Sequence, residues 1–287
     1  MTDRRRFLVS AASAVAGLSA SPALLNVRGA GEGDPFGGFT LGLQSYTYRN
    51  FGLESALRHI KELGLHSVEL SKGHAPLTAE EGQIKALLRL CKEYDITPRV
   101  WGVQHFSKDH DANRKSFEFG KALGLQMLSA SPEPDAFDSL DKLCEEYKIA
   151  IGIHPHGPVG GGKLDRWYSA ELIMAAVKSH HPLIGTCLDT GHLIRSAQLG
   201  KNLDPAEQIR IMGDRNFGLH LKDHDNEHKV DVPFGKGKLD VLSVLQALRA
   251  VKFKGVINIE YEAHPEDPTP DVRECLATFK ECVKKLN

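Results

Sequence analysis

Four apolar runs of this chain end in residues that could ligate a metal ion. The runs cover residues 149–154, 183–189, 217–222 and 256–261, and they supply His154, Asp189, His220 and Glu260. Two imidazoles and two carboxylates suit Mn²⁺, Zn²⁺, Co²⁺ or Fe²⁺ better than Ca²⁺. Four protein ligands would leave two positions of an octahedral ion open for substrate oxygens, as in Lewis-acid catalysis on a hydroxy-carbonyl compound.

Each of these residues has a simpler explanation when it is taken alone. A lone strand histidine is usually a core or surface residue, and Asp189 before Thr190 and Gly191 could form a turn or cap a helix. Four such residues on consecutive strands are harder to explain, because burying two carboxylates without a counter-charge is costly. The pattern therefore predicts a metal site.

A second polar segment, GKGKLD at residues 235–240, resembles a phosphate-binding loop. The alternative is a tight turn before a helix that Asp240 caps. We favour the turn.

The elements that must position the metal ligands alternate regularly from Thr40 onward. Apolar, β-branched runs predict strands, and apolar residues spaced three and four apart predict the helices between them. The strands are predicted at 40–46, 66–71, 97–103, 125–131, 149–154, 183–189, 217–222 and 256–261, and the helices at 53–64, 84–94, 114–124, 137–148, 170–181, 205–213, 239–252 and 271–286. Eight strand–helix pairs in about 250 residues predict a single α/β domain, a (β/α)₈ TIM barrel, whose active site lies at the carboxyl ends of the strands. An open doubly wound sheet is the second choice, but the first strand lacks its glycine-rich turn.

The N-terminus has the layout of an export signal. Arg4, Arg5 and Arg6 precede Phe7 and a short alanine-rich apolar stretch, which predicts a twin-arginine-type signal peptide at residues 1–27. Residues 28–38 form a predicted glycine-rich linker, and residues 39–287 the barrel. An amphipathic N-terminal helix is the alternative. We expect an exported, periplasmic protein that keeps no stable membrane anchor after signal cleavage.

Composition excludes several partners. The formal net charge is -1, so no strong field attracts nucleic acid or anionic lipid. Five cysteines without close pairs predict free, buried or half-buried thiols rather than a disulfide framework. The expected partner is a small carbohydrate, and a homo-oligomer remains open.

Together these motifs resemble the xylose isomerase-like (β/α)₈ barrels, in the branch of sugar phosphate isomerase/epimerase proteins. The segments that carry the resemblance run from Thr40 to the C-terminus: LGLQSYTYR, VEL, IHPHG, CLDTGH, HLKDH, GKGKLD and NIEYE. The resemblance implies one divalent metal, manganese first, with zinc, cobalt, iron or magnesium as alternatives. Asp189, His220 and Glu260 match three ligand positions of the family, and His192 matches a position that contacts a substrate oxygen.

The chain departs from the family at the fourth ligand. Ketose epimerases have a glutamate at the end of the fifth strand, where this chain has His154. In those epimerases this glutamate and the last-strand glutamate are the paired acid/base groups. The departure therefore leaves isomerase, dehydratase and lyase chemistry open.

We expect a divalent-metal-dependent isomerase or epimerase that acts on a sugar or keto-sugar through an enediolate-type intermediate. Glu260 or His156 is the candidate base and Lys222 the candidate acid, while Glu69, His192, Gln44 and Trp101 would bind the substrate. Export favours a phosphate-free substrate. The alternatives are a metal-dependent lyase or dehydratase on a 3-keto-sugar, glycoside or polyol, and a non-catalytic exported sugar-binding protein. A DNA-repair endonuclease, which shares this barrel, is disfavoured by the net charge.

Overall fold

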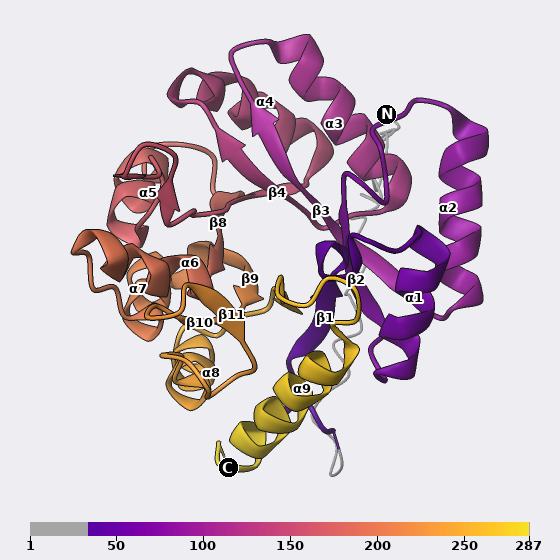
Figure 1. The fold of residues 1–287 in the computed structure, drawn as a ribbon. Coiled ribbons are helices and arrows are strands. Elements are labelled where there is room, and N and C mark those ends of the chain that lie inside the picture. Colours follow the sequence, from indigo (N-terminus) through magenta and orange to yellow (C-terminus); the bar gives the residue numbers. More distant parts are fainter. Residues whose placement is uncertain (1–33, 287) are drawn as a thin grey trace, which may run out of the picture.

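A closed barrel of eight parallel strands forms the centre of the molecule (Figure 1). The computed structural model describes residues 34–286, so the predicted signal peptide lies outside the described residues. The strands run in the order β1-β12-β9-β8-β5-β4-β3-β2, and β1 closes the barrel by pairing with β12. Their bounds are β1 (Thr40–Gln44), β2 (Ser67–Ser71), β3 (Thr97–Phe106), β4 (Met127–Pro132), β5 (Ala150–Ile153), β8 (Ile184–Asp189), β9 (Asn216–Leu221) and β12 (Val256–Ile259). The predicted (β/α)₈ barrel is confirmed.

Helices surround the barrel on all sides (Figure 1). They are α1 (Leu53–Glu62), α2 (Glu81–Glu93), α3 (His110–Leu123), α4 (Phe137–Tyr147), α5 (Ala170–Val177), α6 (Thr190–Arg195), α7 (Pro205–Met212), α8 (Val241–Ala250) and α9 (Thr269–Lys284). Aspartates cap several of them: Asp109 accepts from the backbone N–H of Ala112, and Asp240 from that of Ser243. Gly124 ends α3 in the left-handed conformation, at φ 69°, which glycine adopts at little cost.

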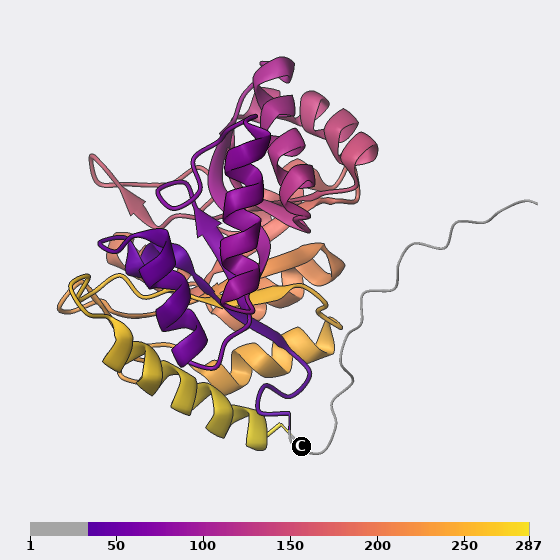
Figure 2. The same ribbon diagram turned by 90° about the vertical axis from the view of Figure 1, so that its right-hand side faces the viewer.

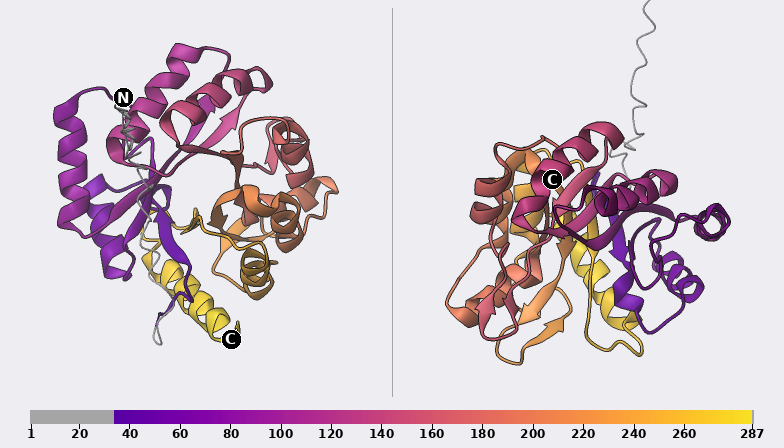
Figure 3. Two further views of the ribbon diagram at one scale, coloured as in Figure 1. Left: turned by 180° about the vertical axis from the view of Figure 1, so that it is seen from behind. Right: turned by 90° about the horizontal axis from the view of Figure 1, so that it is seen from above.

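The loops at the carboxyl ends of two strands carry hairpins that the sequence patterns did not predict. β6 (Pro158–Val159) pairs with β7 (Lys163–Leu164) after β5, and β10 (Asp223–Asp225) pairs with β11 (Val230–Val232) after β9. Both hairpins project from the same end of the barrel (Figure 3). The short α6, also not predicted, begins directly after β8. These elements build up the end of the barrel where the predicted site lies.

The opposite end of the barrel interior is filled by apolar side chains. Val100, Met127, Ala150, Cys187 and Val256 form a separate buried cluster there. Glycines in β5 and β9 make room for the Met127 side chain: a Cβ at either Gly152 or Gly218 would lie 2.5 Å from a Met127 side-chain atom. This packing closes the base of the barrel.

The larger core lies between the barrel and its helices. Phe36 and Phe39, which precede β1, contact Phe279 of α9 edge-on. The side view in Figure 2 shows this helix along the barrel wall. The five cysteines are free thiols, four of them buried and Cys282 half-buried, as the sequence predicted. Among the described residues, no helix is both long and apolar enough to cross a membrane.

Candidate functional site

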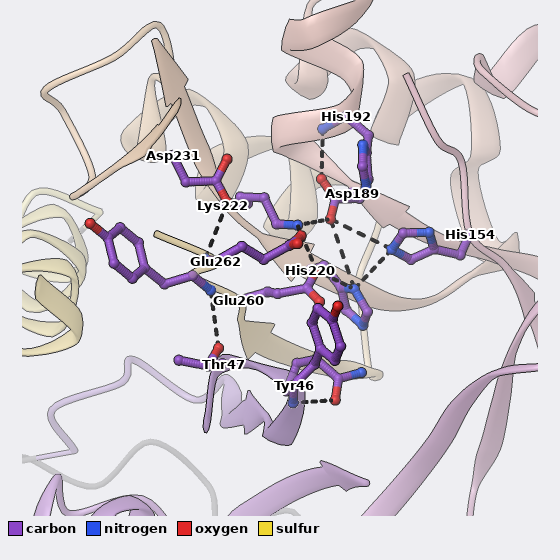
Figure 4. A network of polar contacts seen from close by, with 12 residues as sticks. Tyr46, Thr47, His154, Asp189, His192, His220, Lys222, Asp231, Glu260 and Glu262 are labelled. Carbon is purple, nitrogen blue, oxygen red and sulfur yellow. Dashed lines mark hydrogen bonds and ion pairs between the residues drawn. The ribbon is translucent and has the colours of Figure 1, made fainter. Parts of the chain in front are cut away.

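Four predicted ligands converge at the carboxyl ends of β5, β8, β9 and β12 (Figure 4). One atom from each of His154, Asp189, His220 and Glu260 lies within 4.8 Å of the others, and all four residues are buried. His154 Nε2 lies 2.9 Å from His220 Nδ1 and 3.5 Å from Asp189 Oδ2. Glu260 Oε2 lies 3.1 Å from His220 Nδ1, and Asp189 Oδ2 lies 3.9 Å from the same nitrogen.

The two carboxylate oxygens of Asp189 have different functions. Oδ1 accepts a 2.7 Å hydrogen bond from the backbone N–H of His192 and so caps α6. Oδ2 is buried and has no hydrogen-bond partner among the described residues, and it faces His154 and His220. The cap therefore fixes the carboxylate while one oxygen stays available as a ligand.

His220 is held from below, in the interior of the barrel. Its Nε2 lies 2.7 Å from Glu69 Oε2, and both side chains have no exposed surface. Glu69 also accepts hydrogen bonds from Ser129 Oγ at 2.6 Å and from Asn258 Nδ2 at 2.9 Å. The Glu69 carboxylate accepts a hydrogen bond from the N–H at His220 Nε2, which leaves Nδ1 as the ring atom that faces the ligand cluster.

Lys222 supplies the buried positive charge of the site. Its Nζ lies 2.9 Å from Glu260 Oε2 and 3.4 Å from Asp189 Oδ2, and it also contacts Glu262 at the rim. Although burial alone would raise them, the pKa values of Asp189 and Glu260 are lowered, first by the Lys222 ammonium and then by neighbouring histidines. Burial would lower the pKa of Lys222, but the carboxylates raise it well above its usual value. Both acids are therefore anionic and the lysine cationic at neutral pH.

The residues of this cluster fit a divalent cation. Its inward-facing atoms are two imidazole nitrogens and two carboxylate oxygens, whose lone pairs repel one another unless a cation lies between them. Ligands at about 2.1 Å from one ion lie about 3 Å or more apart, which matches the observed separations. Three buried carboxylates, of Glu69, Asp189 and Glu260, lie within 4 Å of the His220 ring, and the Lys222 ammonium contacts two of them, Asp189 and Glu260. Although burial opposes it, Cys187, Glu69 and Glu260 raise the pKa of His220 well above normal, another sign that the cluster attracts positive charge.

A second group of imidazoles flanks the cluster on the β5 side. The ring of His156 lies 4.8 Å from that of His154 and 5.0 Å from that of His192, measured between centroids. Burial, followed by the nearby His154, lowers the pKa of His156 to about 4. Burial likewise lowers the pKa of His192. Both rings are neutral at pH 7. His156 can accept a proton or a hydrogen bond from a substrate hydroxyl, whereas His192 accepts from Arg195 at Nδ1 and can donate from Nε2.

Three of the residues predicted to bind substrate are buried, and their polar groups contact other groups of the protein. Trp101 is fully buried outside the barrel: its ring packs edge-on against Phe119 of α3, and its Nε1 donates to the carbonyl of Ala75. Glu69 lies beneath His220, with both oxygens occupied by protein donors. Gln44 is buried at the end of β1, where its side chain accepts from the N–H of Tyr46. Of the predicted substrate-binding residues, His192 lies beside the cluster, with its ring next to that of His154.

Tyr46 and Arg49, near this end of the barrel, were not among the predicted site residues. Tyr46, directly after β1, is 43% exposed, and Figure 4 shows its ring directed toward the ligands. The guanidinium of Arg49 lies 5.0 Å from the centre of this ring and donates to the backbone carbonyl of Glu262. Glu262 in turn contacts Lys222. An aromatic residue immediately after a barrel strand was the available signal for Tyr46.

The GKGKLD segment wraps around a buried carboxylate. Asp223 accepts hydrogen bonds of 2.9–3.0 Å from the backbone N–H groups of four residues, Gly235, Gly237, Lys238 and Leu239. A Cβ at Gly237 would lie 2.3 Å from Asp223 Oδ1, so glycine is needed there. Asp240 then caps α8. The predicted tight turn and helix cap are confirmed, and these four N–H groups are not free for a phosphate.

Comparison with known proteins identifies the family. Residues 57–282 match the family described as xylose isomerase-like TIM barrel, and the chain belongs to this family. The resemblance seen in the sequence is thereby confirmed. No curated protein matches the chain significantly.

Solved structures share the fold at low sequence identity. An uncharacterised protein from Parabacteroides distasonis is 25% identical, with a TM-score of 0.65, and the match covers 85% of this chain and 99% of that one. A D-tagatose 3-epimerase-like protein is 19% identical over 86% of this chain and 99% of that one, with a TM-score of 0.66. The 3-keto-D-glucoside 4-epimerase from E. coli is 16% identical over 85% and 100%, also at 0.66.

Proposed function

We propose that this protein is a divalent-metal-dependent isomerase or epimerase of a sugar or keto-sugar. The observation that carries the proposal is the convergence of four buried ligand atoms at the barrel mouth, where Asp189 Oδ2 accepts no hydrogen bond from the described residues. Membership of the xylose isomerase-like family and the sugar epimerases among proteins of the same fold support it. The bound metal ion and the sugar substrate are both proposed here.

His154, Asp189, His220 and Glu260 would hold the ion, with manganese as the first candidate and zinc, cobalt, iron and magnesium as alternatives. Such an ion polarises a substrate carbonyl and stabilises the negative charge of an enediolate.

The protein's own groups supply proton transfer from two sides. Glu260 at the end of β12 is kept anionic by Lys222 and can accept a proton next to the carbonyl. His156, beyond the end of β5, is neutral and flanks the cluster from the opposite side, since β9 and β8 lie between β12 and β5. Lys222 steadies developing negative charge, and His192, whose Nδ1 accepts from Arg195, donates a hydrogen bond from Nε2 to a substrate oxygen. Tyr46 offers an exposed ring for the apolar face of a sugar.

The proposed substrate carries no phosphate. The glycine-rich segment most suited to cradle one donates four of its N–H groups to Asp223. The N-terminal sequence also favours export to the periplasm, whereas phosphorylated sugars are mostly cytosolic.

A metal-dependent lyase or dehydratase acting on a 3-keto-sugar, glycoside or polyol is the second candidate. It is favoured by the histidines at the end of β5, His154 and His156, where a two-carboxylate epimerase would have a glutamate. It would use the same metal and the same base, Glu260, and would expel a leaving group instead of returning a proton to carbon.

The first experiment measures metal content in protein purified without added metal and then reloaded. The wild type should hold about one equivalent, and His154→Ala should lose it. His264→Ala is the matched control, because His264 is an exposed histidine paired with Asp271. Absence of metal from the reloaded wild type would refute the proposal.

Incubation of the loaded protein with keto-sugars in deuterated water then separates the activities. An isomerase or epimerase incorporates deuterium next to the carbonyl, and a lyase or dehydratase releases a fragment or water. A sugar-binding protein without catalysis does neither, and that result would overturn the proposed activity even if the metal is bound.

A further inference from the structure

Glu69 is a charged residue in the deepest polar layer of the barrel. It lies on β2 and has no exposed surface, yet it contacts His220 on β9, three strand positions away around the barrel. A carboxylate in such a place is costly unless its charge is compensated and its lone pairs are satisfied. Its contacts therefore indicate what it does.

Both carboxylate oxygens of Glu69 receive protein donors. Oε1 accepts from Ser129 Oγ at 2.6 Å, and Oε2 accepts from Asn258 Nδ2 at 2.9 Å and faces His220 Nε2 at 2.7 Å. Ser129 and Asn258 come from β4 and β12, so three strands besides its own fix the carboxylate. With the side chain enclosed in this way, Glu69 is unsuited to the substrate contact that the sequence suggested.

We propose that Glu69 is a positioning residue that acts on the metal through His220. An anionic carboxylate can only accept, so the His220 ring donates from Nε2 to Glu69, and Nδ1 is the nitrogen that faces the ligand cluster and binds an ion once it has given up its proton. The contact also fixes the plane of the ring and increases its basicity, as carboxylates behind ligating histidines do. This inference rests on the proposed metal site and deepens it.

Asp223 provides a matched contrast within the same barrel. It is equally buried, but its oxygens accept from backbone N–H groups of the 235–239 loop and contact none of the four ligand side chains that the structure describes. A carboxylate that only holds the fold should change stability when it is neutralised. A carboxylate that orients a ligand should change the metal itself.

The test replaces Glu69 by glutamine, which keeps the size and one acceptor oxygen but removes the charge. Metal-free wild type, Glu69→Gln and Asp223→Asn are titrated with Co²⁺, and its visible absorption spectrum reports the ligand geometry. We expect Glu69→Gln to bind Co²⁺ about 10- to 100-fold more weakly and with a shifted spectrum. Asp223→Asn should melt at a lower temperature but bind Co²⁺ with wild-type affinity and spectrum.

If Glu69→Gln does not fold, Ser129→Ala serves in its place, because it removes one donor that holds Glu69 and leaves His220 intact. It should weaken Co²⁺ binding to a smaller extent and shift the spectrum in the same direction. Wild-type affinity and spectrum in the folded variant would overturn the positioning role while leaving the metal site standing. Failure of the wild type to bind Co²⁺ would instead refute the metal site, and the role of Glu69 with it.

Discussion

The two ends of the barrel interior are built from the same strands but from opposite kinds of side chain. At the base, Met127 and Cys187 pack with Val100, Ala150 and Val256. Cys187 is so enclosed that burial raises its pKa to about 11, and it remains a neutral thiol. At the mouth, the ends of β5, β8, β9 and β12 carry buried ionisable groups instead.

The difference separates stability from chemistry along the barrel axis. Apolar burial at the base favours folding, whereas desolvating the carboxylates at the mouth opposes it. A bound cation would offset the cost of burying the carboxylates at the mouth, which explains why the mouth carries them. Glu69 marks the boundary, because it lies between the apolar base and the ligands above it.

The strongest test of this comparison is Asp189→Asn. An asparagine oxygen can still cap α6, but the ligand charge is lost. We expect metal binding and turnover to disappear while the melting temperature stays near that of the wild type, as measured by metal analysis, activity and thermal unfolding.

Asp189→Ala is the control for the cap. It should lose metal and turnover as well, and in addition about 0.5–2 kcal/mol of stability. Full activity in either variant would mean that Asp189 is not a ligand.

The barrel and the ring of strand-end residues could be predicted from sequence because both follow from periodicity. Alternating helices and apolar strands define the topology, and residues at the carboxyl ends of barrel strands meet at one mouth. His154, Asp189, His220 and Glu260 were found in this way, and the structure brings them together.

Depth and side-chain direction could not be predicted in the same way. Glu69 lies beneath His220 rather than beside the four ligands, and its level within the barrel depends on the stagger between strands. Trp101 was placed near the mouth by its position in the third strand, but the pairing of β3 with β4 shifts register between Trp101 and Gln104. Tyr46 was predicted as the last residue of the first strand but lies in a short 3-10 helix (Ser45–Tyr48), so the strand pattern did not indicate its direction.

Two aromatic residues sharpen the comparison with a smaller effect on catalysis. Tyr46→Ala should raise KM about fivefold, because about 1 kcal/mol of sugar contact is lost, and should leave stability almost unchanged since the ring is exposed.

Trp101→Phe should leave KM unchanged but cost about 1–3 kcal/mol of unfolding free energy, because the buried carbonyl of Ala75 loses its donor. Steady-state kinetics and urea unfolding measure both; a raised KM in Trp101→Phe would place that ring at the substrate after all.

The smallest effect on catalysis is expected from Met127→Ala, at the base. Met127 fills the space that Gly152 and Gly218 leave open, so its truncation creates a cavity and should cost about 2–5 kcal/mol of unfolding free energy. Metal stoichiometry and turnover at a temperature where the variant is folded should match the wild type, since Glu69, beneath the ligand His220, lies between the cavity and the ligands. Met174→Ala, at a half-buried position on α5, is the control and should cost less. If Met127→Ala lost metal while still folded, the base and the mouth would be one coupled unit, and the division of the barrel into a stabilising end and a chemical end would be wrong.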